Sequence, residues 1–274
     1  MIKMEQKTIY RGWNQRNVDF SKAHGNEDDA FERLIESMNL KSGITIGDIM
    51  SGYGAVSQKI LDYCSKNNLF VRIILTDAFE GQINKSSQYL APYELQGYAI
   101  QRRLEDARDL CFENKLDKAV IKMGLHEVPK RGQLRIIQNA YHALKEHGEL
   151  YVWESFGQTP ELSHCFRELI RKKDELAGFN SFVENRYFSH ETEILEQLKE
   201  AGFRDIEIVY KGAFNYNSKN FLEIDFLGDT SKLHAWNEYL RSTLSNEEKK
   251  AVSFNDSDDS ISMQFIKKII KAVK

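Results

Sequence analysis

A glycine-rich turn between a strand and a helix is the feature that most constrains the fold of this chain. The apolar segment 44–49 is expected to form a strand, and Gly52 and Gly54 follow before a helix that places Val56 and Ile60 on one face. Glycine has no Cβ atom, so this loop can turn sharply and let a ligand approach its backbone. The turn therefore predicts an α/β unit whose loop faces a ligand.

The same alternation of strand and helix signals continues through the middle of the chain. Further apolar, strand-like segments are expected at residues 71–76, 99–104, 118–124 and 150–153. Between them the pattern predicts a helix broken near Pro92 and a helix at about 133–145. Near-continuous apolar strands separated by amphipathic helices are typical of a parallel sheet covered on both faces. The predicted fold class is α/β, with a doubly wound, mostly parallel sheet.

The C-terminal third shows a different pattern. Apolar and polar residues alternate at 206–210 and again at 222–226, which predicts an antiparallel strand pair at the end of the sheet. Ser189 is expected to cap the helix that begins after it and ends at Gly202. Two amphipathic segments, 233–240 and 261–270, then predict a helical tail.

Composition restricts the classes of partner. The 274 residues are 41% hydrophobic and 29% charged, with a net charge of −3 and a pI near 6.2. The chain therefore lacks the overall basic character expected of a nucleic-acid-binding domain. No apolar run approaches the roughly 20 residues that a membrane span needs. The three cysteines are far apart and odd in number, which disfavours a disulfide framework or a Cys-rich zinc site. We expect a cytoplasmic protein without nucleic-acid or membrane partners, and leave its oligomeric state open.

Acidic residues follow each of the first three expected strands. Asp48 would repel a pyrophosphate and attract a ligand that carries positive charge. Asp77 lies about 20 residues after the glycine loop, where an acidic side chain can accept both ribose hydroxyls. Asp106 is placed to reach an adenine amino group. Each is individually more often a cap or turn residue, but together they indicate a nucleoside with a cationic tail, such as S-adenosylmethionine.

These motifs resemble those of the class I S-adenosylmethionine-dependent methyltransferases. The resemblance spans roughly residues 30–227 and rests on the order and spacing of segments 48–54, 105–110, 116–121, 125–127 and 143–150. It implies a Rossmann-like methyltransferase fold with S-adenosyl-L-methionine as cofactor. The cofactor-binding residues that it implies are Asp48, Ser51, Gly52, Gly54, Asp77, Ala78, Asp106, Ala107 and Met123. Met50 stands where the family usually has its first glycine.

Residues after the fourth and fifth strands are the candidates for catalysis. His126 and Glu127 would act as a general base or orient the acceptor nucleophile, although each alone is more simply a loop residue. Glu154 is a weaker candidate of the same kind. A strong base is not essential, because a sulfonium methyl group is already activated and alignment supplies much of the acceleration.

Aromatic residues near the two ends are expected to enclose the ligands. Tyr10 or Trp13 could close over the cofactor through cation–π attraction, so Tyr10 is included among the cofactor-binding residues. Phe214, Tyr216 and Phe221 could wall an acceptor pocket, whereas Phe226 and Trp236 are expected in the core. The expected organisation is an N-terminal lid or cap (1–29), a cofactor-binding methyltransferase domain (30–227) and a C-terminal helical extension (228–274).

The predicted function is methyl transfer to a small-molecule acceptor. One alternative is a protein that binds S-adenosylmethionine but has altered catalysis, or that performs other chemistry on the same cofactor. A nicotinamide-dependent oxidoreductase is disfavoured by Asp48, and by Ser57 where the dinucleotide fingerprint has glycine or alanine.

Overall fold

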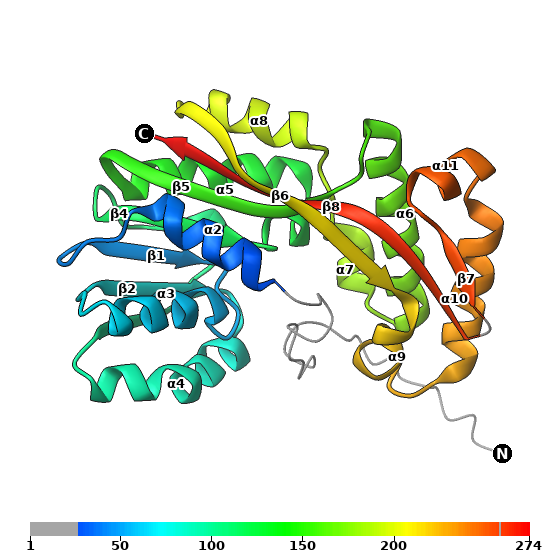
Figure 1. The fold of residues 1–274 in the computed structure, drawn as a ribbon, viewed down its shortest axis with the longest axis horizontal. Coiled ribbons are helices and arrows are strands. Elements are labelled where there is room, and N and C mark those ends of the chain that lie inside the picture. Colours follow the sequence, from blue (N-terminus) through cyan, green and yellow to red (C-terminus); the bar gives the residue numbers. More distant parts are fainter. Residues whose placement is uncertain (1–26, 258) are drawn as a thin grey trace, which may run out of the picture.

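The computed structural model describes residues 27–257 and 259–274, and within them a mixed eight-stranded sheet forms the centre of the molecule (Figure 1). Its strand order is β3-β2-β1-β4-β5-β8-β6, with the short β7 paired to β8 off this path. The strands are β1 (Thr45–Ile49), β2 (Arg72–Asp77), β3 (Ala99–Leu104), β4 (Leu116–Lys122), β5 (Leu144–Phe156), β6 (Arg204–Asn217), β7 (Asn255–Ser257) and β8 (Ser260–Val273). Strands β1 to β5 are parallel, and β8 runs antiparallel to both β5 and β6.

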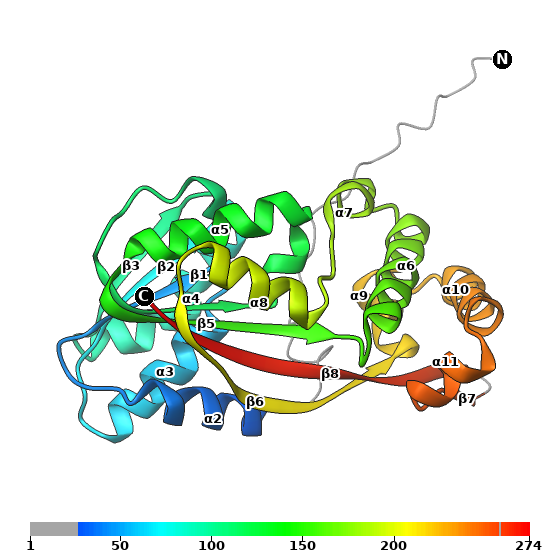
Figure 2. The same ribbon diagram turned by 90° about the horizontal axis from the view of Figure 1, so that it is seen from above.

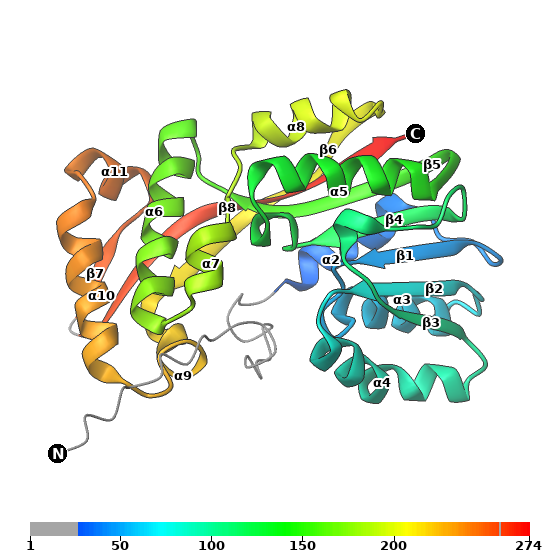
Figure 3. The same cartoon turned by 180° about the vertical axis from the view of Figure 1, so that it is seen from behind.

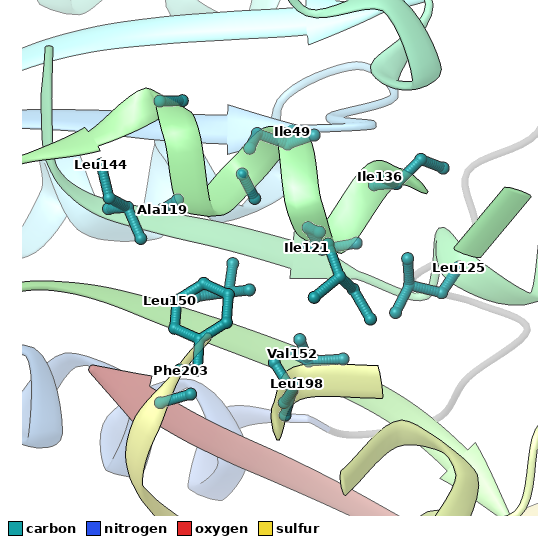
Figure 4. Close-up of a cluster of buried hydrophobic side chains, with 14 of the residues drawn as sticks. Ile49, Ala119, Ile121, Leu125, Ile136, Leu144, Leu150, Val152, Leu198 and Phe203 are labelled. Atoms are coloured by element: carbon teal, nitrogen blue, oxygen red, sulfur yellow. The ribbon is translucent and has the colours of Figure 1, made fainter. Parts of the chain in front are cut away.

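Helices cover both faces of the parallel half, as Figure 2 shows from above. Helices α2 (Asp28–Met38), α3 (Ala55–Lys66) and α4 (Glu80–Leu95) contribute to the core on one face, while α5 (Lys130–Ala143) and α8 (Glu191–Glu200) cover the other. The core under α5 and α8 contains Ile49, Ile121 and Val152 from three adjacent strands (Figure 4). Burial on both faces explains why these strands read as nearly continuous apolar runs. The predicted fold class is thus confirmed.

Strands β6 and β8 extend well beyond the parallel sheet and carry a second group of helices, which we call the cap (Figures 1 and 3). The cap comprises α6 (Pro160–Ala177), α7 (Asn180–Asn185), α9 (Phe221–Ile224), α10 (Thr230–Thr243) and α11 (Asn246–Ala251). Its own hydrophobic core includes Phe166, Tyr216, Trp236 and Phe265. The cap therefore rests on the same sheet as the parallel half, but has a separate core.

Helix α6 is the long helix of the cap, and its ends are marked in the sequence. The Thr159 side chain accepts a hydrogen bond from the Leu162 backbone N–H, and Pro160 occupies the first turn, where it costs no hydrogen bond. Gly178 ends the helix with φ +79°, a conformation that favours glycine. The helix places Phe166, Ile170 and Lys173 at the pocket described below.

Two predictions for the C-terminal third were wrong. Residues 222–226 do not form a strand, because Phe221–Ile224 is the short helix α9. Residues 261–270 are not a helix but part of β8, which lies between β5 and β6. Ile269 and Ile270 point into the cores on opposite faces, so this interior strand lacks the simple alternation that would identify it. The segment 228–274 is therefore not a helical extension outside the sheet.

Smaller differences concern helix ends. Helix α4 continues through Pro92, which lies near its C-terminal end. Helix α8 has His190 rather than Ser189 as its N-cap, in a capping box completed by Glu193. In the part of the chain that the structure describes, no helix combines the length and apolarity needed to cross a membrane.

Candidate functional site

A pocket of about 690 Å³ lies between the carboxyl ends of the parallel strands and the cap. This is the edge at which open α/β sheets bind their ligands. Most of the site residues predicted from the sequence line it: Asp48, Ser51, Gly52, Asp77, Ala78, Asp106, Ala107, Met123, His126 and Glu127. Gly54 begins helix α3 and does not line the pocket. Tyr10 and the rest of the expected lid up to residue 26 fall outside the described residues.

Asp48 lies near the end of strand β1, in a buried position. Its carboxylate oxygen Oδ2 accepts hydrogen bonds from the Ser57 backbone N–H at 3.1 Å and the Ser57 hydroxyl at 2.6 Å. Burial raises the pKa of Asp48 to about 7, although the two bonds from Ser57 oppose that rise. A buried carboxylate of this kind would gain from a nearby positive charge. Ser57 therefore has a defined role in orienting Asp48.

The loop after Asp48 contains three residues in the left-handed region. Met50, Gly52 and Gly54 have φ of 58°, 55° and 91°. Met50 thus adopts a backbone conformation that favours glycine, at a cost of about 1 kcal/mol for the Cβ atom. Its side chain packs against Gly124, where an added Cβ would lie 2.9 Å from the Met50 Cβ. The turn therefore accommodates Met50 through a positive φ and packing against Gly124.

Asp77 is tied to the glycine loop by its side chain. Its Oδ2 accepts the Gly52 N–H at 2.8 Å and its Oδ1 accepts the Phe79 N–H at 2.9 Å. A carboxylate has about four lone-pair positions, so each oxygen keeps acceptor capacity toward the pocket. Burial raises the pKa of Asp77, and the two backbone hydrogen bonds limit that rise. The arrangement suits a ligand with two neighbouring hydroxyls.

Asp106 is engaged by a residue that sequence reasoning missed. It caps the short helix η2 (Ala107–Asp109), and the Arg108 guanidinium donates to both carboxylate oxygens, at 2.9 Å from Nε to Oδ1 and 2.6 Å from Nη2 to Oδ2. These bonds hold the pKa of Asp106 below its usual range. Arg108 also lines the pocket. Arg108 immediately follows Asp106-Ala107 in the sequence. An arginine this close to an acidic turn was the signal that could have indicated their ion pair.

His126 lies between two carboxylates. Its Nδ1 is 2.7 Å from Glu154 Oε2 and its Nε2 is 3.1 Å from Glu127 Oε1. Burial opposes protonation of His126, but Glu154 and Glu127 outweigh it and raise its pKa to about 9. With both ring nitrogens donating, His126 is an imidazolium at neutral pH and has no nitrogen available to accept a proton.

Glu127 continues this contact into the cap. Arg186, which follows α7, donates to its two oxygens at 2.8 and 2.9 Å, and to Asp174 of α6 at 2.9 Å. Although burial opposes ionisation, Arg186 and His126 lower the pKa of Glu127 well below its usual range. Asp174 also contacts Lys173, whose ammonium pairs with Asp225. Sequence reasoning missed Arg186, Lys173 and Asp174. Nothing local to Lys173 or Arg186 indicates their partners, which lie 52 and 59 residues away in the sequence.

The cap side of the pocket is largely aromatic. Phe214, Tyr216 and Phe221 line it, as expected for an acceptor wall. Phe226 and Trp236 belong to the buried core of the cap and do not line it, also as expected. Phe166 and Phe188 complete the wall, and neither stood out in the sequence. One side of the pocket thus carries carboxylates, and the other is mainly aromatic but includes the paired side chains of Lys173 and Arg186.

Comparisons with known proteins identify the fold. No protein-family model and no curated protein sequence matches the chain. Among solved structures, the YcgJ protein of Bacillus subtilis matches 90% of this chain and 98% of its own at a TM-score of 0.74 and 14% identity. A candidate methyltransferase from Bacillus halodurans matches 90% and 99% at 0.71 and 17% identity. The chain has the fold of the class I methyltransferases.

Two other solved structures with this fold have different activities. Phosphoethanolamine N-methyltransferase 2 of Haemonchus contortus, solved with S-adenosylhomocysteine, is 17% identical over 92% of this chain and 53% of its own, with a TM-score of 0.55. The [4+2]-cyclase SpnF is 16% identical over 97% and 86%, with a TM-score of 0.59. Identities this low establish a shared fold and leave the chemistry to be argued from the site.

Proposed function

We propose that this protein is an S-adenosylmethionine-dependent methyltransferase that acts on a small-molecule acceptor. The observation that carries the proposal is the row of three carboxylates, Asp48, Asp77 and Asp106, along one edge of a class I methyltransferase sheet. Solved neighbours with this fold include complexes with S-adenosylhomocysteine and small-molecule ligands. The pocket of about 690 Å³ is also within the usual range for small ligands.

Each part of the cofactor has a matching group in the pocket. Asp77 would accept the two ribose hydroxyls while its own orientation is fixed by the Gly52 and Phe79 amides. Asp48 would lie near the cationic methionine part, and Asp106 with Ala107 near the adenine. Ser51, Ala78 and Met123 line the same side of the pocket. When bound, S-adenosylmethionine would supply an activated methyl group on a cationic sulfur.

The residues after β4 would position the acceptor rather than remove its proton. His126 is already protonated at neutral pH, so it stabilises Glu127 instead of acting as a base. Glu127 would accept a hydrogen bond from the nucleophile and hold it in line with the methyl group. An electron pair of the nucleophile (a lone pair on N, O or S, or a π or carbanion pair on C) would form the new bond to the methyl carbon as its bond to sulfur breaks with both electrons kept by sulfur. The acceptor's proton would leave to water.

A dinucleotide fits the site poorly. Ser57 occupies the third position of the dinucleotide fingerprint, where its hydroxyl donates to Asp48. A pyrophosphate at this turn would meet the buried carboxylate of Asp48. The alternative is a protein with this fold that performs other chemistry or has lost catalysis. The cyclase SpnF supports the first of these, because it has the same fold and a different activity.

A thermal-shift series tests the cofactor assignment. S-adenosylmethionine and S-adenosylhomocysteine are expected to raise the unfolding temperature, because a ligand at 100 times its Kd stabilises a protein by about 2.7 kcal/mol. NAD and NADH at equal concentrations are expected to have no effect. Stabilisation by NAD or NADH alone would reverse the assignment. Mass spectrometry of protein incubated with S-adenosylmethionine and a metabolite extract would then identify the methylated acceptor.

We also propose a cover for the cofactor and a cellular location. A lid from residues 1–29 would cover the cofactor with Tyr10, and a cytoplasmic location would supply S-adenosylmethionine. Tyr10→Ala should weaken cofactor binding if this lid forms.

A further inference from the structure

A lysine at the end of β4 accompanies Asp48 on the wall of the pocket. Asp48 pairs with Val120 across β1 and β4, and Lys122 lies two residues further along β4. Alternate residues of a strand point to the same face of a sheet, so the two side chains leave the sheet on the same side. Both residues line the pocket. This part of the wall therefore carries a carboxylate and an ammonium group on adjacent strands.

The Lys122 ammonium is held by two residues that also line the pocket. It pairs with Glu27 at 2.9 Å, and its Nζ stands 5.6 Å from the centroid of the Phe31 ring. The Lys122 side chain is 14% exposed, whereas Lys267, which binds the other oxygen of Glu27, is 4% exposed and does not line the pocket. An ammonium group has three N–H donors, so Lys122 can donate to a ligand while it keeps Glu27.

Electrostatics place Lys122, rather than other cations of the wall, beside Asp48. Burial raises the pKa of Asp48 to about 7, and the positive charge of Lys122 is one of the effects that oppose this rise. Arg108 is instead bound to the third carboxylate of the row. Lys173 and Arg186 are paired with buried carboxylates across the pocket. The pocket thus offers opposite charges side by side at the end of β1 and β4.

A second lysine approaches the same aromatic ring from α3. Lys59 also lines the pocket, and its Nζ is 5.7 Å from the centroid of the Phe31 ring. It pairs with Asp28 at 3.1 Å and its side chain is 44% exposed, so solvent weakens the effect of its charge. We therefore expect Lys59 to add to the positive potential at this end of the pocket, and the more enclosed Lys122 to make the direct contact with a ligand.

We propose that Lys122 binds the carboxylate of the methionine part of S-adenosylmethionine and thereby selects cofactors that carry this group. The ammonium and the carboxylate of an amino acid are bonded to one carbon atom, so the groups that bind them must be neighbours. With Asp48 beside the cationic part, Lys122 is the neighbouring cation. Its hydrogen bond to a carboxylate would be charge-assisted and therefore strong. This inference rests on the proposed function, which places the methionine part at this end of the pocket.

S-adenosylmethionine and its decarboxylated form are a matched pair of probes, because they differ only in the carboxylate. Each is titrated calorimetrically into the wild type and into Lys122→Met, which keeps an unbranched side chain and removes the ammonium. The wild type should bind S-adenosylmethionine at least about tenfold more tightly than the decarboxylated form. Lys122→Met should bind S-adenosylmethionine about tenfold or more weakly, and the decarboxylated form with unchanged or slightly higher affinity.

Lys118→Met is the matched control. Lys118 lies four residues earlier on β4, its side chain is 13% exposed, and it shares the carboxylate of Glu149 with Lys271. This repeats the arrangement at Lys122, but Lys118 does not line the pocket. Lys118→Met should therefore lower the unfolding temperature, as Lys122→Met does, and keep the wild-type preference for S-adenosylmethionine.

Three results would overturn this inference while the proposed function stands. The first is equal affinity of the wild type for the two forms of the cofactor, which requires no variant. The second is an unchanged affinity of Lys122→Met for S-adenosylmethionine. The third is equal weakening of both forms in Lys122→Met, which would show that Lys122 only supports the fold. Failure of the wild type to bind S-adenosylmethionine or S-adenosylhomocysteine would overturn the proposed function, and the inference with it.

Discussion

The two sides of the pocket are built from opposite chemistry. Along the sheet edge, carboxylates are fixed by nearby donors: Asp48 by Ser57, Asp77 by Gly52 and Phe79, and Asp106 by Arg108. Across the pocket, the cap presents mainly aromatic rings, together with Lys173 and Arg186, which are paired with buried carboxylates. The acidic side can recognise a polar ligand of fixed shape. On the aromatic side, substitutions that change side-chain volume would alter which molecules fit. The difference between the two sides suits a cofactor of fixed structure on the acidic side and a second ligand, which could differ between related proteins, on the aromatic side.

A chain of ion pairs joins the two sides. Glu127, at the end of the parallel sheet, is held by Arg186, which also holds Asp174 of the cap helix α6. Both contacts are almost fully enclosed, because the Arg186 side chain is 8% exposed and that of Asp174 is wholly buried. The position of the cap relative to the sheet edge should therefore depend on Arg186.

Removing this link is expected to have the largest effect. Arg186→Ala should lower the free energy of unfolding by about 3–5 kcal/mol, because it removes the guanidinium from two buried carboxylates. Denaturant titration measures this loss. Arg33→Ala, which breaks an exposed ion pair with Glu36, is the control and should cost less than about 1 kcal/mol. Equal small losses in the two variants would mean that Arg186 does not hold the cap to the sheet.

The acidic side should show a stability cost that depends on pH. Burial raises the pKa of Asp48 from 3.8 to about 7, so the native state binds more protons than the unfolded state between these values. Stability therefore falls as the pH rises through this window, by up to about 4 kcal/mol. Asp48→Asn keeps an acceptor for Ser57 and removes that cost.

Unfolding measured at pH 4 and pH 8 separates these effects. Asp48→Asn should match the wild type at pH 4 and be more stable at pH 8, while binding S-adenosylmethionine less tightly. The exposed Asp109→Asn variant should show no such difference between the two pH values. A loss of stability in Asp48→Asn at pH 8 would show that the buried carboxylate stabilises the turn rather than serving a ligand.

The smallest effect is expected at Met50. Glycine there would relieve the left-handed backbone by about 1 kcal/mol. It would also lose packing of the methionine side chain against Gly124 and the neighbouring core, which contributes a similar amount. Met50→Gly should thus change stability by less than about 1 kcal/mol and cofactor affinity by less than about threefold. A larger gain in affinity would mean that Met50 obstructs the cofactor.

The acidic side was largely predictable from sequence, because its residues follow local strand signals and parallel strands end at one edge. The apolar side was only partly predictable. Phe214, Tyr216 and Phe221 were recognised, but Phe166, Phe188 and Arg186 reach the pocket through tertiary packing of α6 and the segment after α7. Strand β8 was misread as a helix because Ile269 and Ile270 are both buried, on opposite faces. His126 was considered as a general base because the sequence does not show that Glu154, 28 residues later, contacts its Nδ1 atom.

Calorimetric titration of S-adenosylmethionine into the wild type and Asp77→Ala examines the ribose site, on which the proposed function depends most. The wild type should bind, and Asp77→Ala should bind at least about 100-fold more weakly, since two hydrogen bonds to a charged group are lost. Asp109→Ala, an exposed carboxylate variant, should bind like the wild type. Unchanged affinity in Asp77→Ala would show that the carboxylates at this sheet edge do not hold S-adenosylmethionine as proposed.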